Sequence, residues 1–119
     1  MIELVLDALD KEDELIGEPF SGRAGRLFLK LANQAGIEEH ELIIVPISPA
    51  YQPFSKNIVI LAGNKARKMF KMDKEEYGTF NFNIVSWYSP SYILQRGKSI
   101  DKLTVEFLKQ VKEKHERIE

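Results

Sequence analysis

A turn-rich loop that leads into a helix carries the residues of this chain best suited to bind an anion. The loop ends at Gly22, and Arg23 and Arg26 follow within about one helical turn. The start of a helix offers free N–H groups and a partial positive charge to anions. Arginine side chains bind phosphate oxygens, and glycine lets the backbone approach a ligand closely. Gly22, Arg23 and Arg26 are therefore predicted to contact the phosphate groups of a ligand.

Phe20 stands at the tip of the same loop, directly after Pro19. A flat, rigid aromatic side chain at a loop tip suits a nucleobase that has left its stack, because the face of a base is apolar. The alternative is that Phe20 packs on its own helix as a hydrophobic staple. The sequence leaves both interpretations open.

Acidic residues gather in the segment 7–18, and Asp7 and Asp10 lie where the first apolar strand ends. A carboxylate at the end of a buried strand can act as a base and can also stabilise a developing cation. The segment 21–98, in contrast, holds eleven Lys and Arg against six Asp and Glu, a net charge of +5. This charge distribution suits a protein that binds phosphates and keeps carboxylates near the reacting point. The alternative is an ordinary solvated surface.

Three segments of the chain resemble the uracil-DNA glycosylase superfamily, especially its family 4 branch, and they occur in the family's order. The family segment G-x-P-F-V-G-x-A-G-x-L resembles residues 17–27, which read G-E-P-F-S-G-R-A-G-R-L. The strand-to-helix turn i-V-x-L-G-x-x-A resembles residues 57–66, N-I-V-I-L-A-G-N-K-A. The family's T-Y-H-P-S-Y-L-L-R run resembles residues 86–96, S-W-Y-S-P-S-Y-I-L-Q-R.

The resemblance implies roles for the first loop. In glycosylases of this superfamily, that loop positions a water and stabilises the cationic sugar as the base leaves. Asp7 and Asp10 are accordingly the predicted catalytic residues. Phe20 matches the phenylalanine that stacks on the uracil ring, so it is predicted to bind the base.

The 86–96 segment is similarly interpreted from the resemblance. Ser89 stands where the family has the histidine that donates to the leaving uracil oxygen, and it is predicted to bind the base. Ser91 and Arg96 are predicted to hold the nucleic-acid strand. Trp87 and Tyr88 are candidate stacking platforms, with a core position as the alternative for Trp87.

Several family positions are altered in this chain. Val45 falls roughly where the family has the asparagine that reads the uracil edge, and valine cannot form hydrogen bonds with a base. The cluster cysteines are also absent. The resemblance thus implies a short, degenerate member that binds DNA or a nucleotide with weak or no glycosylase activity. The alternatives are an active DNA glycosylase for uracil or another damaged base, and a replication accessory subunit that binds a protein partner or forms a homodimer.

The order of expected elements predicts how these residues are positioned. Strands are expected at residues 2–6, 41–47, 57–61 and 79–87, and helices at residues 22–34, at 64–72 and from Ser99 onward. Strand and helix alternate, which predicts one α/β domain over residues 1–119, a three-layer α/β/α fold with a central, mainly parallel four-stranded sheet. Ligands of such sheets bind beyond the carboxyl ends of the strands. That rule selects the loops at residues 7–21, 48–56, 62–65 and 88–97.

Composition narrows the function classes. The 119 residues are 44% hydrophobic and 29% charged, as in an ordinary globular domain. The chain has no cysteine, which excludes disulfides and thiolate-held metal clusters. No apolar run approaches the roughly 18 residues of a membrane span, and the N-terminus lacks the charge of a secretory signal, so a cytoplasmic protein is expected. Neither His40 nor His115 has metal-ligand spacing with another histidine, and neither a cofactor nor a metal is expected.

Overall fold

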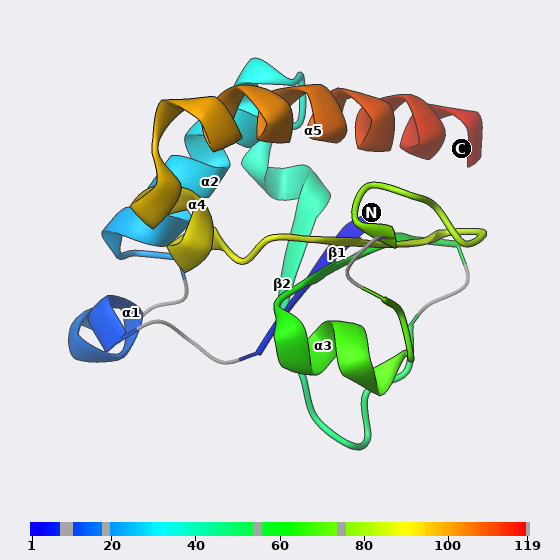
Figure 1. The fold of residues 1–119 in the computed structure, drawn as a ribbon, viewed down its shortest axis with the longest axis horizontal. Coiled ribbons are helices and arrows are strands. Elements are labelled where there is room, and N and C mark those ends of the chain that lie inside the picture. The colour runs from blue at the N-terminus through cyan, green and yellow to red at the C-terminus, as the bar shows by residue number, and fades with distance from the viewer. Residues whose placement is uncertain (8–10, 18–19, 54–55, 74–75, 119) are drawn as a thin grey trace.

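The fold is a parallel sheet between two layers of helices (Figure 1). The computed structural model describes residues 1–7, 11–17, 20–53, 56–73 and 76–118. The four strands pair in parallel in the order β2-β1-β3-β4. They are β1 (Ile2–Leu6), β2 (Leu42–Pro46), β3 (Ile58–Ala62) and β4 (Ile84–Trp87). The predicted three-layer α/β class is thereby confirmed.

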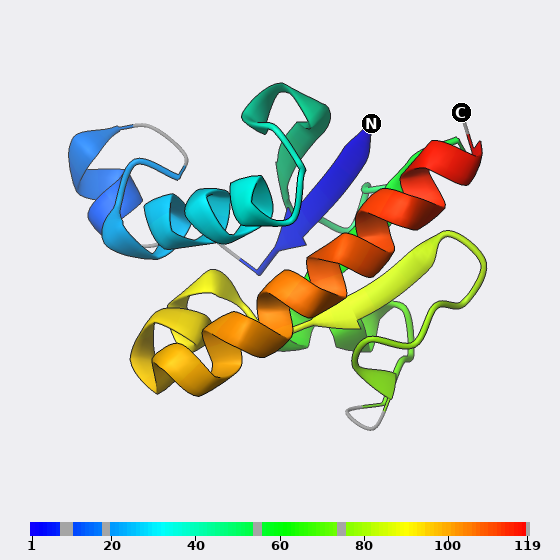
Figure 2. The ribbon, with the colours of Figure 1, turned by 90° about the horizontal axis from the view of Figure 1, so that it is seen from above.

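Helices cover the two faces of the sheet unequally. Helices α2, α4 and α5 lie over one face, seen from above in Figure 2, and α3 lies below the other face in Figure 1. Among the described residues, each helix is too short or too polar to cross a bilayer. The helices are α1 (Lys11–Ile16), α2 (Arg23–Gln34), α3 (Asn64–Met69), α4 (Pro90–Arg96) and α5 (Lys98–Ile118), with a short 3-10 helix η1 (Glu39–Glu41) before β2.

Two apolar clusters hold the layers together, because successive side chains of a strand point to opposite faces. Leu4 belongs to the cluster that also contains Phe28 of α2 and Leu108 of α5. Val5 belongs to the second cluster, with Ala66 of α3. Every residue of β1 and β3 is buried, as expected for central strands with apolar side chains on both faces.

Three expectations about local structure are wrong, and all three are for segments that include or adjoin the end of a strand. The segment 7–21 contains helix α1 and is not purely a loop, and the strand expected at 79–87 is regular only over β4. The segment 88–97, expected as a loop, contains α4. Ser89 accepts a hydrogen bond from the N–H of Tyr92 and Pro90 occupies the first turn, which are two standard signals of a helix start.

The C-terminal tail is also more ordered than its charge suggests. Charged terminal segments often fray, yet α5 continues through the charged tail to Ile118. The Nζ of Lys112 lies 3.1 Å from Oε1 of Glu41, and His115 is buried. Contacts with the segment before β2 therefore stabilise the last turns of α5.

Candidate functional site

Three strands end at the same edge of the sheet and bring their following residues together. Leu6 lies opposite Ala62, and Ala62 lies opposite Trp87 in the parallel register. The residues that follow these strands, Asp7 and the turns at Gly63 and Tyr88, therefore meet beyond the carboxyl edge. This is the edge at which ligands bind in open α/β sheets.

A cavity of about 280 Å³ opens at this edge. It gathers residues from the end of β1, from α1, from the start of α2, from the end of β3 and from the turn into α4. Four of the predicted site residues, Asp7, Phe20, Ser89 and Ser91, line it although they span most of the chain. The other lining residues are Leu6, Lys11, Asp13, Ala24, Gly25, Ala62 and Pro90.

Asp7 is held in position by the helix that follows β3. Its Oδ1 accepts a hydrogen bond of 2.9 Å from the N–H of Ala66, in the first turn of α3. A carboxylate at a helix start satisfies a free N–H and interacts favourably with the helix dipole. Asp7 is thus a capping residue for α3 and a wall of the cavity at the same time.

Phe20 packs on its own helix and lines the cavity as well. Its side chain is only 6% exposed, and its ring centre lies 5.9 Å from that of Phe28. Its backbone adopts a left-handed conformation with φ of 60°. Gly25 is required beside it, because a Cβ on Gly25 would overlap the Cα, Cβ and Cγ of Phe20. The two interpretations of Phe20 left open by the sequence are therefore compatible.

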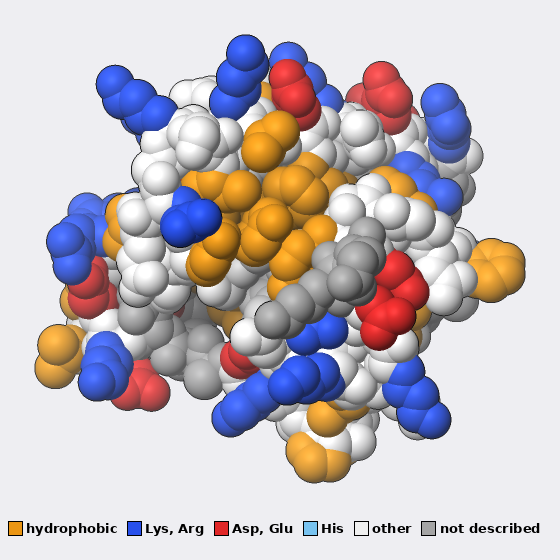
Figure 3. Space-filling view, in the orientation of Figure 1, with side chains coloured by type: hydrophobic (Ala, Val, Ile, Leu, Met, Phe, Trp, Pro, Cys, Tyr) orange, Lys and Arg blue, Asp and Glu red, His pale blue; other side chains and the backbone are white. Residues whose placement is uncertain are grey.

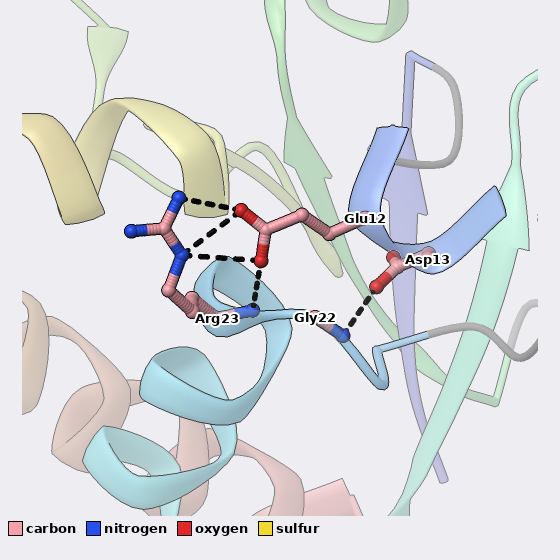
Figure 4. A network of polar contacts seen from close by, with 4 residues as sticks. All are labelled: Glu12, Asp13, Gly22 and Arg23. Carbon is pink, nitrogen blue, oxygen red and sulfur yellow. Dashed lines mark hydrogen bonds and ion pairs between the residues drawn. The ribbon is translucent and has the colours of Figure 1, made fainter. Parts of the chain in front are cut away.

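The start of α2, predicted to bind phosphate, already binds carboxylates of α1 (Figure 4). Asp13 is 1% exposed, and its Oδ1 accepts a hydrogen bond of 2.7 Å from the N–H of Gly22. Glu12 accepts from the backbone N–H of Arg23 at 3.0 Å and from its guanidinium at 2.6 Å. The chain itself thus supplies the anions that this helix start attracts.

The ion pair between Glu12 and Arg23 affects the chemistry of both groups. Hydrogen bonds from the Arg23 side chain and backbone lower the pKa of Glu12 to about 2. A phosphate that approaches Arg23 would have to compete with this carboxylate. Arg26 is exposed one turn further on and does not line the cavity.

A second cavity of about 350 Å³ adjoins the first, since Asp7 and Ser89 line both. Its remaining walls are mainly aromatic. Its lining residues are Asp7, Gly63, Asn64, Tyr77, Tyr88, Ser89 and Tyr92. Tyr88 therefore lies where a stacking residue was expected.

Trp87 occupies the core position that was its alternative. It is 9% exposed, and its ring stacks on Phe107 with centres 4.2 Å apart. Its Nε1–H donates to Oγ1 of Thr104 at 3.1 Å. Trp87 thus packs against Tyr88 from the core side, with the two ring centres 5.2 Å apart.

Other predicted residues lie at the rim or outside these cavities. Arg96 is exposed, with its guanidinium carbon 5.4 Å from the ring centre of Tyr92. Asp10 lies outside the described residues. Val45 is half-buried on the edge strand β2, opposite Val5, and lines neither cavity.

Sequence reasoning missed five charged, polar or aromatic site residues, which are Lys11, Asp13, Asn64, Tyr77 and Tyr92. Asp13 belongs to the acidic segment 7–18, and its contact with Gly22 gave no local signal. Tyr77 reaches the second cavity from a segment that carries no recognisable motif, and Asn64 lies in the strand-to-helix turn at residues 57–66, to which no site role was assigned. Among the described residues, the group spaced to hold a metal ion is Glu38, His40 and Glu41, which precedes β2 at the opposite end of the sheet.

The chain matches no protein-family model and no curated protein sequence. The sheet order and the helix layers show that the chain has an α/β fold. The lining of the two cavities shows which of the predicted site residues lie close together. Membership of the uracil-DNA glycosylase superfamily accordingly stays a prediction that depends on the three resembling segments.

Proposed function

We propose that this protein is a degenerate relative of the uracil-DNA glycosylases that binds a nucleobase of nucleic acid, with weak or no glycosylase activity. One observation carries the proposal. The first cavity combines Phe20, Ser89 and Asp7, which come from three segments of the chain. Small-ligand sites typically combine aromatic walls with a few polar groups in such cavities.

The cavity walls match the chemistry of a base. The largely buried ring of Phe20 contributes an apolar part of the wall, while the hydroxyl groups of Ser89 and Ser91 offer donors and acceptors to a polar edge. Lys11 adds a cation at the same cavity, which suits the phosphate attached to a nucleotide.

The polar groups favour binding over cleavage of the glycosidic bond. Cleavage needs a donor that stabilises negative charge on the departing base. Ser89 uses its Oγ as a helix cap for α4, and its hydroxyl is uncharged. One oxygen of Asp7 is engaged by Ala66, which restricts how the carboxylate can position a water.

A second candidate function is an active glycosylase that removes uracil or another damaged base. The observation that favours it is the presence of two carboxylates, Asp7 and Asp13, on the wall of one cavity. In this candidate Asp7 activates the water, as the resemblance implies, and Asp10 is the other predicted catalytic residue.

One experiment tests both candidates. The purified protein is incubated with uracil-containing and matched thymine-containing oligonucleotides, single- and double-stranded. Alkali cleavage reports abasic sites, and a gel shift in the same samples reports binding. We expect binding without uracil-dependent cleavage, and we expect Phe20→Leu to weaken that binding because the stacking ring is lost.

The variant Asp7→Asn separates the outcomes. Asparagine keeps an oxygen that can accept from Ala66 but loses the negative charge. Cleavage by the wild type that disappears in Asp7→Asn would establish the glycosylase and refute the proposed inactivity. A wild type that neither cleaves nor shifts any oligonucleotide would refute both candidates.

A further inference from the structure

The second cavity is an open, aromatic space directly beside the first. The two cavities share the wall formed by Asp7 and Ser89. Three tyrosines line the second cavity, and Tyr92 among them is 36% exposed. The cavity is therefore accessible from solvent. Its aromatic rings surround an open space, whereas the packed core of a protein leaves no such space.

The rings around this cavity are arranged in a rigid stack. Tyr88 and Tyr92 are nearly parallel, with ring centres 4.8 Å apart and an angle of 12° between their planes. The ring of Tyr77 meets Tyr88 edge-on at 4.6 Å, and Trp87 contacts Tyr88 from the core side. Such support fixes the ring positions before a ligand arrives, which lowers the entropy cost of binding.

The surroundings of the stack are apolar and charged. Figure 3 shows hydrophobic side chains gathered in the middle of one face, over β4, α4 and α5, with both basic and acidic side chains around them. The guanidinium carbon of Arg96 lies over the exposed ring of Tyr92, 5.4 Å from its centre. A guanidinium group in that position can stack with a base or bind a phosphate.

We propose that the second cavity binds the base next to the one in the first cavity, so that the protein takes two consecutive nucleotides of a single strand. This inference depends on the proposed function, because it needs the first base in place. The tyrosine stack receives the second base, and Asn64 and Ser89 offer hydrogen bonds to its edge. The connecting phosphate passes on the Arg96 side, since the Asp7 carboxylate between the cavities repels it.

A single strand fits this arrangement better than a duplex. Bases must be unstacked and unpaired before aromatic side chains can reach their faces. Two adjacent bases would both have to leave a duplex, at an energetic cost that a single strand largely avoids. Aromatic platforms beside basic groups are typical of proteins that bind single strands.

Competition against a fluorescein-labelled oligothymidylate, measured by fluorescence polarisation, tests the inference. The competitors are thymidine 5′-monophosphate, the dinucleotide pTpT, pTpT with an abasic second position, and a blunt duplex. We expect pTpT to compete at least about tenfold better than either the mononucleotide or the abasic form, because one further base stacks. The duplex is expected to compete least well.

Substitutions locate the second base. Tyr92→Leu should weaken pTpT by about tenfold and leave the mononucleotide unchanged. Tyr92→Phe keeps the ring and should bind like the wild type. Phe82→Leu is the matched control, because Phe82 is an aromatic residue that is 87% exposed and lines neither cavity.

The outcomes distinguish this inference from the proposed function. Equal affinities for pTpT and the mononucleotide, an unchanged pTpT affinity in Tyr92→Leu, or a preference for the duplex would each overturn the inference alone. Failure of every nucleotide and oligonucleotide to bind would overturn the proposed function, and the inference with it.

Discussion

The carboxylate of Asp7 occupies the space that a side chain on Gly63 would need. A Cβ on Gly63 would lie 2.5 Å from Oδ1 of Asp7, and the backbone there has a φ of 150°. Because Gly63 has no side chain, the carboxylate of Asp7, which directly follows β1, can reach the start of α3. One glycine thus determines both a helix cap and the wall between the two cavities.

Gly63→Ala is expected to destabilise the protein and to displace Asp7. The overlap should cost about 1–3 kcal/mol in the free energy of unfolding, in addition to the backbone strain. Gly36→Ala is the matched control, because Gly36 also has a positive φ but has no atom within 4 Å of the added Cβ. Urea denaturation measures both variants. Equal losses of stability would contradict the close contact between Asp7 and residue 63.

Gly25→Ala tests the contact that positions Phe20. In an exposed helix this substitution would stabilise by about 1 kcal/mol. Here the added Cβ overlaps Phe20, so we expect a net loss of stability and weaker binding of a nucleobase. Asn33→Ala, at an exposed position of the same helix, is the control and should be neutral or slightly stabilising. A stabilised Gly25→Ala variant would show that Phe20 lies elsewhere.

The ion pair between Glu12 and Arg23 predicts a stability difference that depends on pH. The pKa of Glu12 falls from 4.5 to about 2 in the folded chain, so folding favours its charged form. The contribution to stability is therefore fully present above about pH 4.5 and is lost as the pH falls toward 2. We expect Glu12→Gln to be less stable than the wild type at pH 7 and equally stable near pH 2. Urea midpoints at pH 7, 4 and 2.5 measure this, and a constant difference across that range would refute the pairing.

Lys112→Ala should weaken the attachment of the last turns of α5. Burial raises the pKa of Glu41, but the hydrogen bond and charge of the Lys112 ammonium, together with a backbone hydrogen bond from Glu38 and the charge of His115, lower the pKa below its usual value. We expect a loss of about 1 kcal/mol at neutral pH, because the pair is partly buried. Lys109→Ala, at an exposed position of the same helix, should be close to neutral. Amide exchange at residues 112–118 should speed up only in Lys112→Ala, and unchanged exchange there would exclude the anchoring role.

Local hydrophobic patterns correctly predicted the central strands, in which every residue is buried. The apolar runs at residues 2–6 and 58–61 appear as central strands because both of their faces are covered. Gly36 has a φ of 90° just beyond the end of α2, as expected of a residue that stops a helix. The rule that parallel sheets bind ligands at their carboxyl edge then identified the region in which the cavities open.

By itself, the sequence determined the order of the four strands and of the helices α2, α3 and α5, because hydrophobic periodicity is a local property. Tertiary structure alone decided which side chains meet beyond the carboxyl edge of the sheet. Glu12 and Asp13 bind the start of α2, Asp7 caps α3, and Tyr77 joins the aromatic cavity. These contacts join segments that are separated along the chain, so they leave no periodic signal. Their partners become neighbours only after the strands have aligned in register.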